Sequence, residues 1–137
     1  MTDPIEPVTV LIIDDMEEIR SLLRDVITEL TDFRIAGEAE DGVEGLRLAE
    51  ATQPDLILLD LSMPRMDGLE VLPRLREAAP RARIVVLSGF SGDRMGPIAL
   101  QLGAAVYLEK GVTPDQIVSA LLKEAPSPAD RARREAR

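Results

Sequence analysis

The chain has 137 residues with 45% apolar side chains, which fits one domain with a core of its own, and no apolar run approaches the roughly 20 residues of a membrane span. Because cysteine and histidine are absent, disulfides, cysteine zinc sites and the Ser-His-Asp triad are excluded, so any chemistry uses carboxylates, hydroxyls, Lys, Arg or Tyr107. The net charge of −9 argues against a general nucleic-acid binder, and the N-terminus lacks a signal-type apolar stretch, so we expect a cytoplasmic protein.

Short apolar runs alternate along the chain with longer segments of helical period. The short runs predict strands over Val8–Ile13, Phe33–Glu38, Asp55–Leu59, Arg83–Leu87 and Ala105–Leu108. The first, third and fourth are nearly continuous in Val, Ile and Leu, as in parallel strands covered on both faces. This alternation predicts an α/β domain with a five-stranded, mostly parallel sheet.

Five helices are predicted between and after these strands, because apolar residues recur there at steps of three and four. The apolar stripes cover 19–30, 43–49, 69–75, 95–102 and 117–122. Three sequence pairs have the form of a capping box, namely Asp15 with Glu18, Asp41 with Glu44, and Thr113 with Gln116. Gly103 is a helix stop, and Pro73 predicts either a late start or a kink in the third helix.

The last twelve residues differ from the rest in composition. Residues 126–137 begin Pro-Ser-Pro and carry four Arg against Asp130 and Glu135, so their charge is +2 and that of residues 1–125 is −11. We therefore expect one domain over 1–125, followed by a charged tail that is flexible or a weak, solvated helix. No second domain is visible in the sequence.

Polar residues stand where the predicted strands end. Asp14 and Asp15 follow the first strand, Asp60 the third and Lys110 the fifth, and Ser88 ends the fourth. Right-handed crossovers bring the carboxyl ends of parallel strands to one edge of a sheet, where ligands bind at the point of reversed strand order. We therefore expect these five side chains to lie close together.

Taken singly, these residues have simpler explanations: Asp15 is a good helix cap, and Asp60 could mark where the chain leaves the core. These explanations are insufficient for the group as a whole, because carboxylates about 4 Å apart repel by about 4 kcal/mol per pair at an effective dielectric near 20. A bound Mg²⁺ removes that conflict, since it prefers carboxylate oxygens. The choice of Lys at 110 also stands out in a chain with fourteen Arg and only two Lys.

Four motifs, "IIDDMEEIR", "LLDLSMPRMDGLEVL", "VVLSG" and "GAAVYLEKG", occur in this order at the predicted strand ends. With them the chain resembles the receiver domain of bacterial two-component response regulators over Val8–Glu124. The resemblance implies a doubly wound, flavodoxin-like fold. It also implies a signalling switch rather than an enzyme, with activity limited to its own phosphorylation and dephosphorylation.

The resemblance also assigns roles to individual residues. Asp60 would accept a phosphoryl group from a sensor histidine kinase or a phosphotransfer protein. Mg²⁺ would be held by Asp14, Asp15, Asp60 and the backbone carbonyl of Ser62. Around the phosphoryl group, Lys110 would pair with one oxygen, Ser88 would donate its hydroxyl to another, and Gly89 would leave room beside Ser88.

The expected output is a change in protein binding. The resemblance implies that Tyr107 swings inward on phosphorylation, although a half-buried ring at a strand end explains it as well. A downstream protein would bind the face of the fourth helix, fifth strand and fifth helix, through which two copies could also pair. We expect no direct binding to nucleic acid or membrane. Gly111 stands where many family members have a proline after a cis bond, so that geometry is not assumed.

Three other interpretations remain open. The chain could be an interaction module with an inert site, or a fragment of a DNA-binding regulator. It could also be a phosphatase of the haloacid dehalogenase type, which forms an aspartyl phosphate. Ser62 argues against the phosphatase, because such enzymes place a second aspartate two residues after the nucleophile.

Overall fold

The computed structural model describes residues 6–63 and 68–135, so the stretch 64–67 of the second motif lies outside the described residues. The strands are β1 (Thr9–Ile13), β2 (Arg34–Ala39), β3 (Leu56–Leu59), β4 (Arg83–Ser88) and β5 (Val106–Glu109). The helices are α1 (Glu17–Leu30), α2 (Gly42–Thr52), α3 (Gly68–Ala78), α4 (Gly92–Gln101), α5 (Pro114–Glu124) and α6 (Pro128–Glu135). Among the described residues, no helix combines the length and apolar character that a membrane span needs.

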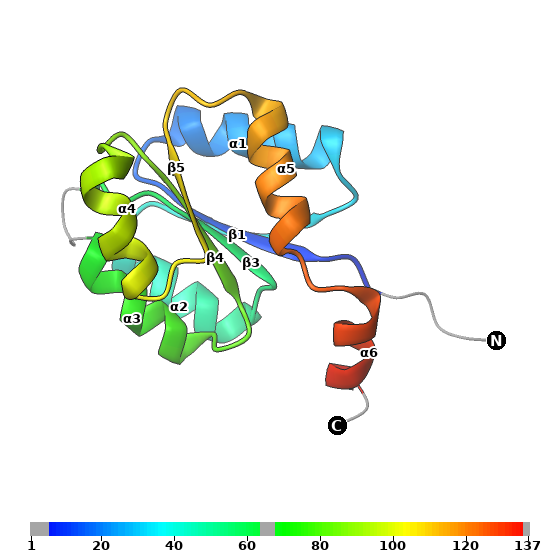
Figure 1. Ribbon diagram of the computed structural model, residues 1–137. Helices are drawn as coiled ribbons and strands as arrows, with labels where there is room; N and C mark the ends of the chain where they lie inside the picture. The colour runs from blue at the N-terminus through cyan, green and yellow to red at the C-terminus, as the bar shows by residue number, and fades with distance from the viewer. Residues whose placement is uncertain (1–5, 64–67, 136–137) are drawn as a thin grey trace.

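The strands form one parallel sheet in the order β2-β1-β3-β4-β5, which confirms the predicted α/β architecture (Figure 1). The chain leaves β1 toward one edge for β2 and then crosses back to place β3 on the other side of β1. Strand order therefore reverses between β1 and β3, and a crevice at their carboxyl ends is the usual ligand position in such sheets.

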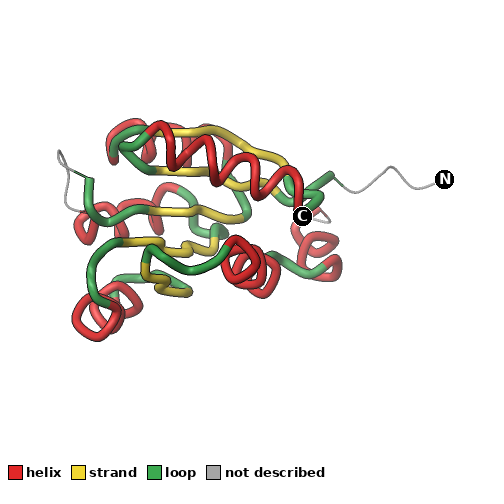
Figure 2. Tube along the Cα trace, turned by 90° about the horizontal axis from the view of Figure 1, so that it is seen from above, coloured by secondary structure: helices red, strands yellow, loops and turns green. Residues whose placement is uncertain are grey.

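Helices cover both faces of the sheet: α1 and α5 lie on one face, and α2, α3 and α4 on the other (Figure 1). Figure 2 shows the strands side by side with helices around them. Alternation along β1 separates the two cores, because Leu11 and Ile13 pack toward α2 and α3 while Val10 and Ile12 pack toward α1 and α5. Both faces are apolar, as the continuous apolar runs predicted.

Most of the predicted helix signals are found in the structure. Thr113 and Gln116 form the complete capping box of α5, and the side chain of Asp41 caps α2 by accepting from the amide of Glu44. Gly103 follows α4 with a φ of +117°, a conformation that glycine adopts without strain. Pro73 lies inside α3, whose helical residues begin at Gly68, so the alternative of a late start is wrong.

The predicted capping box of Asp15 and Glu18 is also wrong. Helix α1 begins at Glu17, its N-cap position is Met16, and no side chain caps it there. The carboxylate of Asp15 instead belongs to a cluster of acidic side chains at the end of β1. The Asp15 side chain thus joins the other carboxylates at the sheet edge and does not cap the helix.

The described part of the charged tail contains α6. Its first turn is stabilised by a reciprocal pair, in which Ser127 donates through its amide and hydroxyl to Asp130 and accepts from the amide of Asp130. Arg131 lines a cavity of about 490 Å³ with Glu6, Pro7 and Asp55, so α6 lies beside the start of β1 (Figures 1 and 2). Helix α6 is therefore at the amino edge of the sheet, away from the strand ends that carry the acidic residues.

Candidate functional site

The residues that follow the strands are held in place by continued strand pairing. The amide of Asp14 donates to Ala39 O at 3.0 Å, and that of Asp60 donates to Ile13 O at 2.9 Å. The amide of Lys110 donates to Ser88 O at 2.7 Å. Because these backbone positions belong to the sheet ladder, the side chains leave the carboxyl edge in fixed directions.

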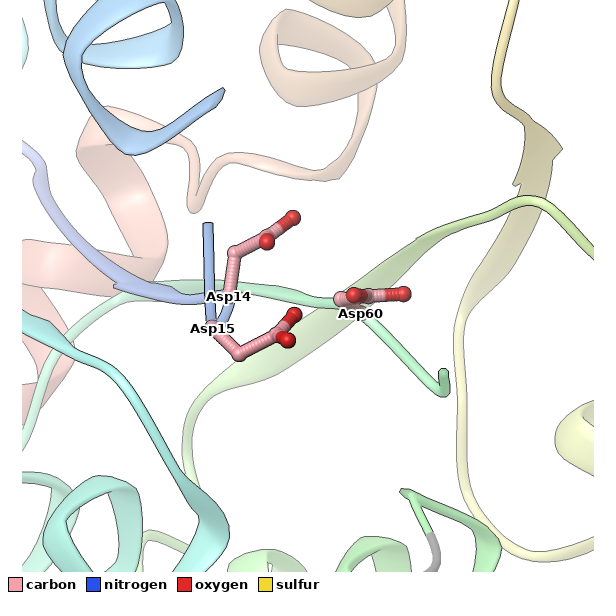
Figure 3. Close-up of side chains that lie close together, drawn as sticks. All are labelled: Asp14, Asp15 and Asp60. Carbon is pink, nitrogen blue, oxygen red and sulfur yellow. The ribbon is translucent and has the colours of Figure 1, made fainter. Parts of the chain in front are cut away.

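Three carboxylates converge at this edge (Figure 3). Asp14, Asp15 and Asp60 each offer one oxygen, and these oxygens lie within 4.8 Å of one another. The side chains of Asp14 and Asp60 are only 3% and 1% exposed, whereas Asp15 is exposed. The sheet topology thus brings together the three aspartates that the sequence placed at two separate strand ends.

Lys110, which follows β5, forms ion pairs with both buried aspartates. Its Nζ lies 3.5 Å from Asp14 Oδ2 and 3.4 Å from Asp60 Oδ2. The cluster has three carboxylates and Lys110 supplies one ammonium beside two of them, so the site has an excess of negative charge. The bond between Lys110 and Gly111 is trans, and Gly111 has a φ of +110°, a value that proline cannot adopt.

The two oxygens of Asp60 differ in their surroundings. Oδ1 accepts two hydrogen bonds from Ser62, one from its amide at 2.9 Å and one from its hydroxyl at 2.6 Å. Oδ2 is buried, has no hydrogen-bond partner among the described residues and lies 3.4 Å from the Nζ of Lys110. The carboxylate is therefore anchored through one oxygen and leaves the other available.

Burial raises the pKa of Asp14 above its usual value. The backbone amide of Met16, which donates to Asp14 Oδ1 at 2.9 Å, and the Lys110 ammonium lower this pKa, while the carboxylates of Asp60 and Asp15 raise it. The net rise means that the negative charge on Asp14 lacks full compensation from the protein. A cation at this position would supply what the protein does not.

The donor set fits Mg²⁺. It consists of carboxylate oxygens, which this hard cation prefers, and one oxygen from each of Asp14, Asp15 and Asp60 lies within 4.8 Å of the others. Mg²⁺ is usually held by one or two carboxylates together with waters and substrate phosphate oxygens. One exposed and two buried carboxylates therefore suit an ion that keeps part of its coordination open.

Of the remaining predicted site residues, Ser88 ends β4, Gly89 follows it and Tyr107 lies on β5. Ser88 is fully buried, and its Oγ accepts from the amide of Phe90 at 3.2 Å. A Cβ added to Gly89 would meet no atom within 4 Å, so packing does not require glycine there. Tyr107 is half-buried, and its hydroxyl donates to Phe90 O at 2.7 Å, so the ring is tied to the segment that follows Ser88.

Two contributions were missed by the sequence analysis. The hydroxyl of Ser62 binds Asp60, whereas only the backbone carbonyl of Ser62 was predicted to contribute. Glu109, next to Lys110, accepts from the amide of Gly92 at the start of α4. No local signal could have indicated the second contact, because the two residues are 17 positions apart and belong to different elements.

The fold and this edge define a doubly wound α/β domain with a carboxylate cluster, a lysine and a serine at its switch point. A family model of the response regulator receiver domain matches residues 10–122. The chain is 43% identical over 120 residues to the nitrate/nitrite response regulator protein NarL of Escherichia coli K12, covering 88% of this chain and 56% of that protein. It is 32% identical over 115 residues to the chemotaxis protein CheY of Listeria monocytogenes, covering 84% and 96%.

A solved complex of CheX and CheY with BeF3 and Mg²⁺ from Borrelia burgdorferi is also similar, with 26% identity and a TM-score of 0.80. That match covers 85% of this chain and 88% of the other. The chain belongs to the response regulator receiver domain family, and it is a phosphoacceptor signalling domain. It spans about half the length of NarL and of the other curated relatives that it matches first.

Proposed function

We propose that Asp60 accepts a phosphoryl group from the phosphohistidine of a sensor histidine kinase or a phosphotransfer protein. One observation carries this proposal: Asp60 Oδ2 is buried, has no hydrogen bond among the described residues and lies 3.4 Å from the Lys110 ammonium. An unpartnered buried carboxylate oxygen is costly. Its cost is understandable if the oxygen is kept available as a nucleophile.

In the transfer, Asp60 Oδ2 attacks phosphorus in line with the bond to the partner's histidine. The oxygen–phosphorus bond forms as the phosphorus–nitrogen bond breaks, and the electron pair of the broken bond returns to the imidazole. Such transfers depend mainly on positioning and on neutralising the charge of the phosphoryl oxygens. Lys110 then pairs with one phosphoryl oxygen, and the Ser88 hydroxyl donates to another.

Mg²⁺ belongs to the same proposal. Asp14, Asp15, Asp60 and the backbone carbonyl of Ser62 would hold it, and when bound it supplies positive charge beside the phosphoryl oxygens. The raised pKa of Asp14 and the excess of carboxylates over ammonium groups support this assignment. The similar CheY complex, whose description includes BeF3 and Mg²⁺, supports it as well.

The output of the switch is a change in protein binding at the surface of α4, β5 and α5. Ile98 and Leu100 on α4 and Leu122 on α5 are exposed apolar side chains that a downstream protein, or a second copy of the chain, could cover. Tyr107 connects the phosphorylation site to this surface, because it lies on β5 and its hydroxyl donates a hydrogen bond to Phe90 O in the segment after Ser88. Phosphorylation would bias this surface between two arrangements.

The proposal is tested by incubating the protein with acetyl phosphate and Mg²⁺ and measuring the intact mass. We expect the mass of one added phosphoryl group in the wild type, none in Asp60→Asn, and none after removal of Mg²⁺ with EDTA. Asp32→Asn is the matched control, because it removes an exposed carboxylate outside the acidic cluster and should be phosphorylated like the wild type. Phosphorylation of Asp60→Asn at the wild-type level would refute the assignment of Asp60.

Other results would favour the alternatives. Absence of any added phosphoryl in the wild type would favour an inert interaction module. Multiple turnovers with p-nitrophenyl phosphate would favour a phosphatase, although the Ser62 hydroxyl is bonded to Asp60 and supplies no carboxylic acid for the leaving group. A gel shift with DNA at physiological salt would favour a regulator that binds nucleic acid directly.

A further inference from the structure

Helix α4 is capped at its N-terminus by a residue from another element. Its N-cap residue is Ser91, a type that usually caps with its own hydroxyl, but the Ser91 side chain makes no capping hydrogen bond. The amide of Gly92, the first residue of the helix, donates to Oε1 of Glu109 on β5. The first turn of α4 therefore has two possible side-chain acceptors, and Glu109, the one more distant in sequence, makes the hydrogen bond.

Three hydrogen bonds connect residues 88–92 to β5 and the residue after it, and Glu109 makes one of them. The segment begins at Ser88, whose carbonyl accepts from the amide of Lys110 at 2.7 Å. In its middle, Phe90 O accepts from the Tyr107 hydroxyl at 2.7 Å. At its end, Gly92 donates to Glu109. Strand β5 and the following Lys110 thus hold the whole segment that begins at Ser88.

The shape of this contact depends on glycine at position 92. A Cβ added there would lie 3.0 Å from Glu109 Oε1, closer than nearly all real contacts of this kind. A larger residue would require this carboxylate oxygen to move by a few tenths of an ångström. Gly92 and Glu109 are therefore matched to each other across 17 positions of sequence.

We propose that Glu109 is a positioning residue for Ser88, and that its carboxylate is exchanged for the Ser91 hydroxyl as the cap of α4 when Asp60 is phosphorylated. This proposal depends on the proposed function. A bond that exists in only one of two arrangements favours that arrangement, so Glu109 favours the unphosphorylated one. The amides of the first turn need an acceptor in both, and in the other arrangement the Ser91 hydroxyl accepts from the amide of Asp93 or Arg94, the positions that an N-cap side chain reaches.

The exchange predicts opposite effects for two neighbouring substitutions. Glu109→Ala should increase the rate of phosphorylation by acetyl phosphate by roughly tenfold, the equivalent of one hydrogen bond to a charged group. Ser91→Ala should decrease this rate by roughly fivefold, because it removes a cap that forms only in the phosphorylated arrangement. Ser91→Ala should leave the thermal stability of the unphosphorylated protein unchanged.

Two further variants separate this role from a general structural one. Glu109→Gln keeps a side-chain oxygen that can accept from Gly92, so it should behave like the wild type. Gly92→Ala displaces the carboxylate and should change the rate in the same direction as Glu109→Ala, with no further change when the two are combined. A purely structural contribution of Glu109 would not give this pattern.

The chain provides its own spectroscopic probe, because Tyr107 is its only tyrosine and it has no tryptophan. Tyrosine fluorescence therefore reports on the segment that Glu109 holds. In titrations with beryllium fluoride and Mg²⁺, Glu109→Ala should reach its midpoint at a lower concentration than the wild type, and Ser91→Ala at a higher one.

Shifts of Glu109→Ala and Ser91→Ala in the same direction, or no shift in either, would overturn the exchange. If the wild type gains no phosphoryl group at all, the proposed function fails. The positioning role of Glu109 is then tested by the fluorescence of the unphosphorylated variants alone. Altered Tyr107 fluorescence in Glu109→Ala and Gly92→Ala, but not in Ser91→Ala, would then support the positioning role of Glu109. An equal response of all three would overturn it.

Discussion

At Asp60, the hydrogen bonds from Ser62 to Oδ1 and the ammonium beside Oδ2 give the two oxygens of one carboxylate different tasks. The charged residues around Asp60 suit ligand binding better than they suit folding stability. Three carboxylates with one ammonium do not maximise stability, because buried charges are costly unless they are fully paired. The site therefore trades stability for a place where a cation and a phosphoryl group can bind.

This trade can be measured at Asp14. Burial raises the pKa of this carboxyl, so the folded protein keeps the proton at a higher pH than the unfolded chain does. The stabilising contribution of the protonated form is complete below the unfolded value of 3.8 and is lost as the pH rises through the raised folded pKa. Without Mg²⁺, Asp14→Asn should therefore be more stable than the wild type at neutral pH, by on the order of 1 kcal/mol.

Urea unfolding in EDTA over a range of pH values tests this expectation. The advantage of Asp14→Asn should shrink as the pH falls toward 3.8 and vanish below it. Asp15→Asn is the matched control, because it removes an exposed carboxylate of the same cluster and should have a smaller effect. A lower stability of Asp14→Asn at neutral pH would contradict the view that its charge is a burden in the absence of the ion.

The sequence was sufficient to predict that these side chains lie together, but not the bonds between them. Asp14, Asp60 and Lys110 could be placed because each follows an apolar run and parallel strands end at one edge. The two hydrogen bonds from Ser62 depend on a side-chain rotamer, which no sequence pattern indicates. The bond of Glu109 depends on where α4 starts relative to β5, which only the folded chain determines.

Among the elements, α2 illustrates how tightly the sheet edge is supported. Gly45 lies buried in the helix against Ile13, the last residue of β1 before Asp14. A Cβ at position 45 would lie 2.7 Å from Ile13 Cδ1, with Cγ1 and Cγ2 also within 3.2 Å. The close approach of α2 to β1 therefore requires glycine at this position.

Gly45→Ala should lower the free energy of unfolding by about 1 kcal/mol, because overpacking costs about 1–3 kcal/mol and the better helix propensity of alanine returns about 1 kcal/mol. Gly96→Ala is the matched control in α4, where an added Cβ would meet Tyr107 only at 3.8 Å. It should raise the stability by up to about 1 kcal/mol. Chemical unfolding of both variants gives the comparison, and a gain in stability for Gly45→Ala would show that Ile13 yields without cost.

The elements themselves were largely predictable, and the errors have local physical reasons. The strand bounds shift by only a residue or so, because the apolar runs are short and continuous. The Asp15 cap was wrong because a competing use of the carboxylate decides its direction. Helix α6 agrees with the solvated helix that was one of the two alternatives for the tail, and hydrogen bonds between Ser127 and Asp130, with Pro128 at the first helical position, stabilise its start.

At the scale of the whole molecule, the fold concentrates charge at one edge. The chain carries a net charge of −9, and its three clustered aspartates follow the neighbouring strands β1 and β3. Such a molecule responds to any added salt through general screening. A specific Mg²⁺ site adds to this response only when the cluster is intact.

Mg²⁺ should therefore stabilise the folded chain beyond the effect of ionic strength alone. At a concentration one hundred times the Kd, a ligand that binds only the folded state adds about 2.7 kcal/mol, which for a domain of this size raises the Tm by on the order of 10 °C. Thermal unfolding in MgCl2 should be compared with unfolding in NaCl of the same ionic strength. Asp60→Asn and Asp14→Asn should respond equally to the two salts, whereas the wild type should be more stable in MgCl2. An equal response of the wild type would show that the cluster screens its charge without holding an ion, and the assignment of Mg²⁺ to these residues would then be wrong.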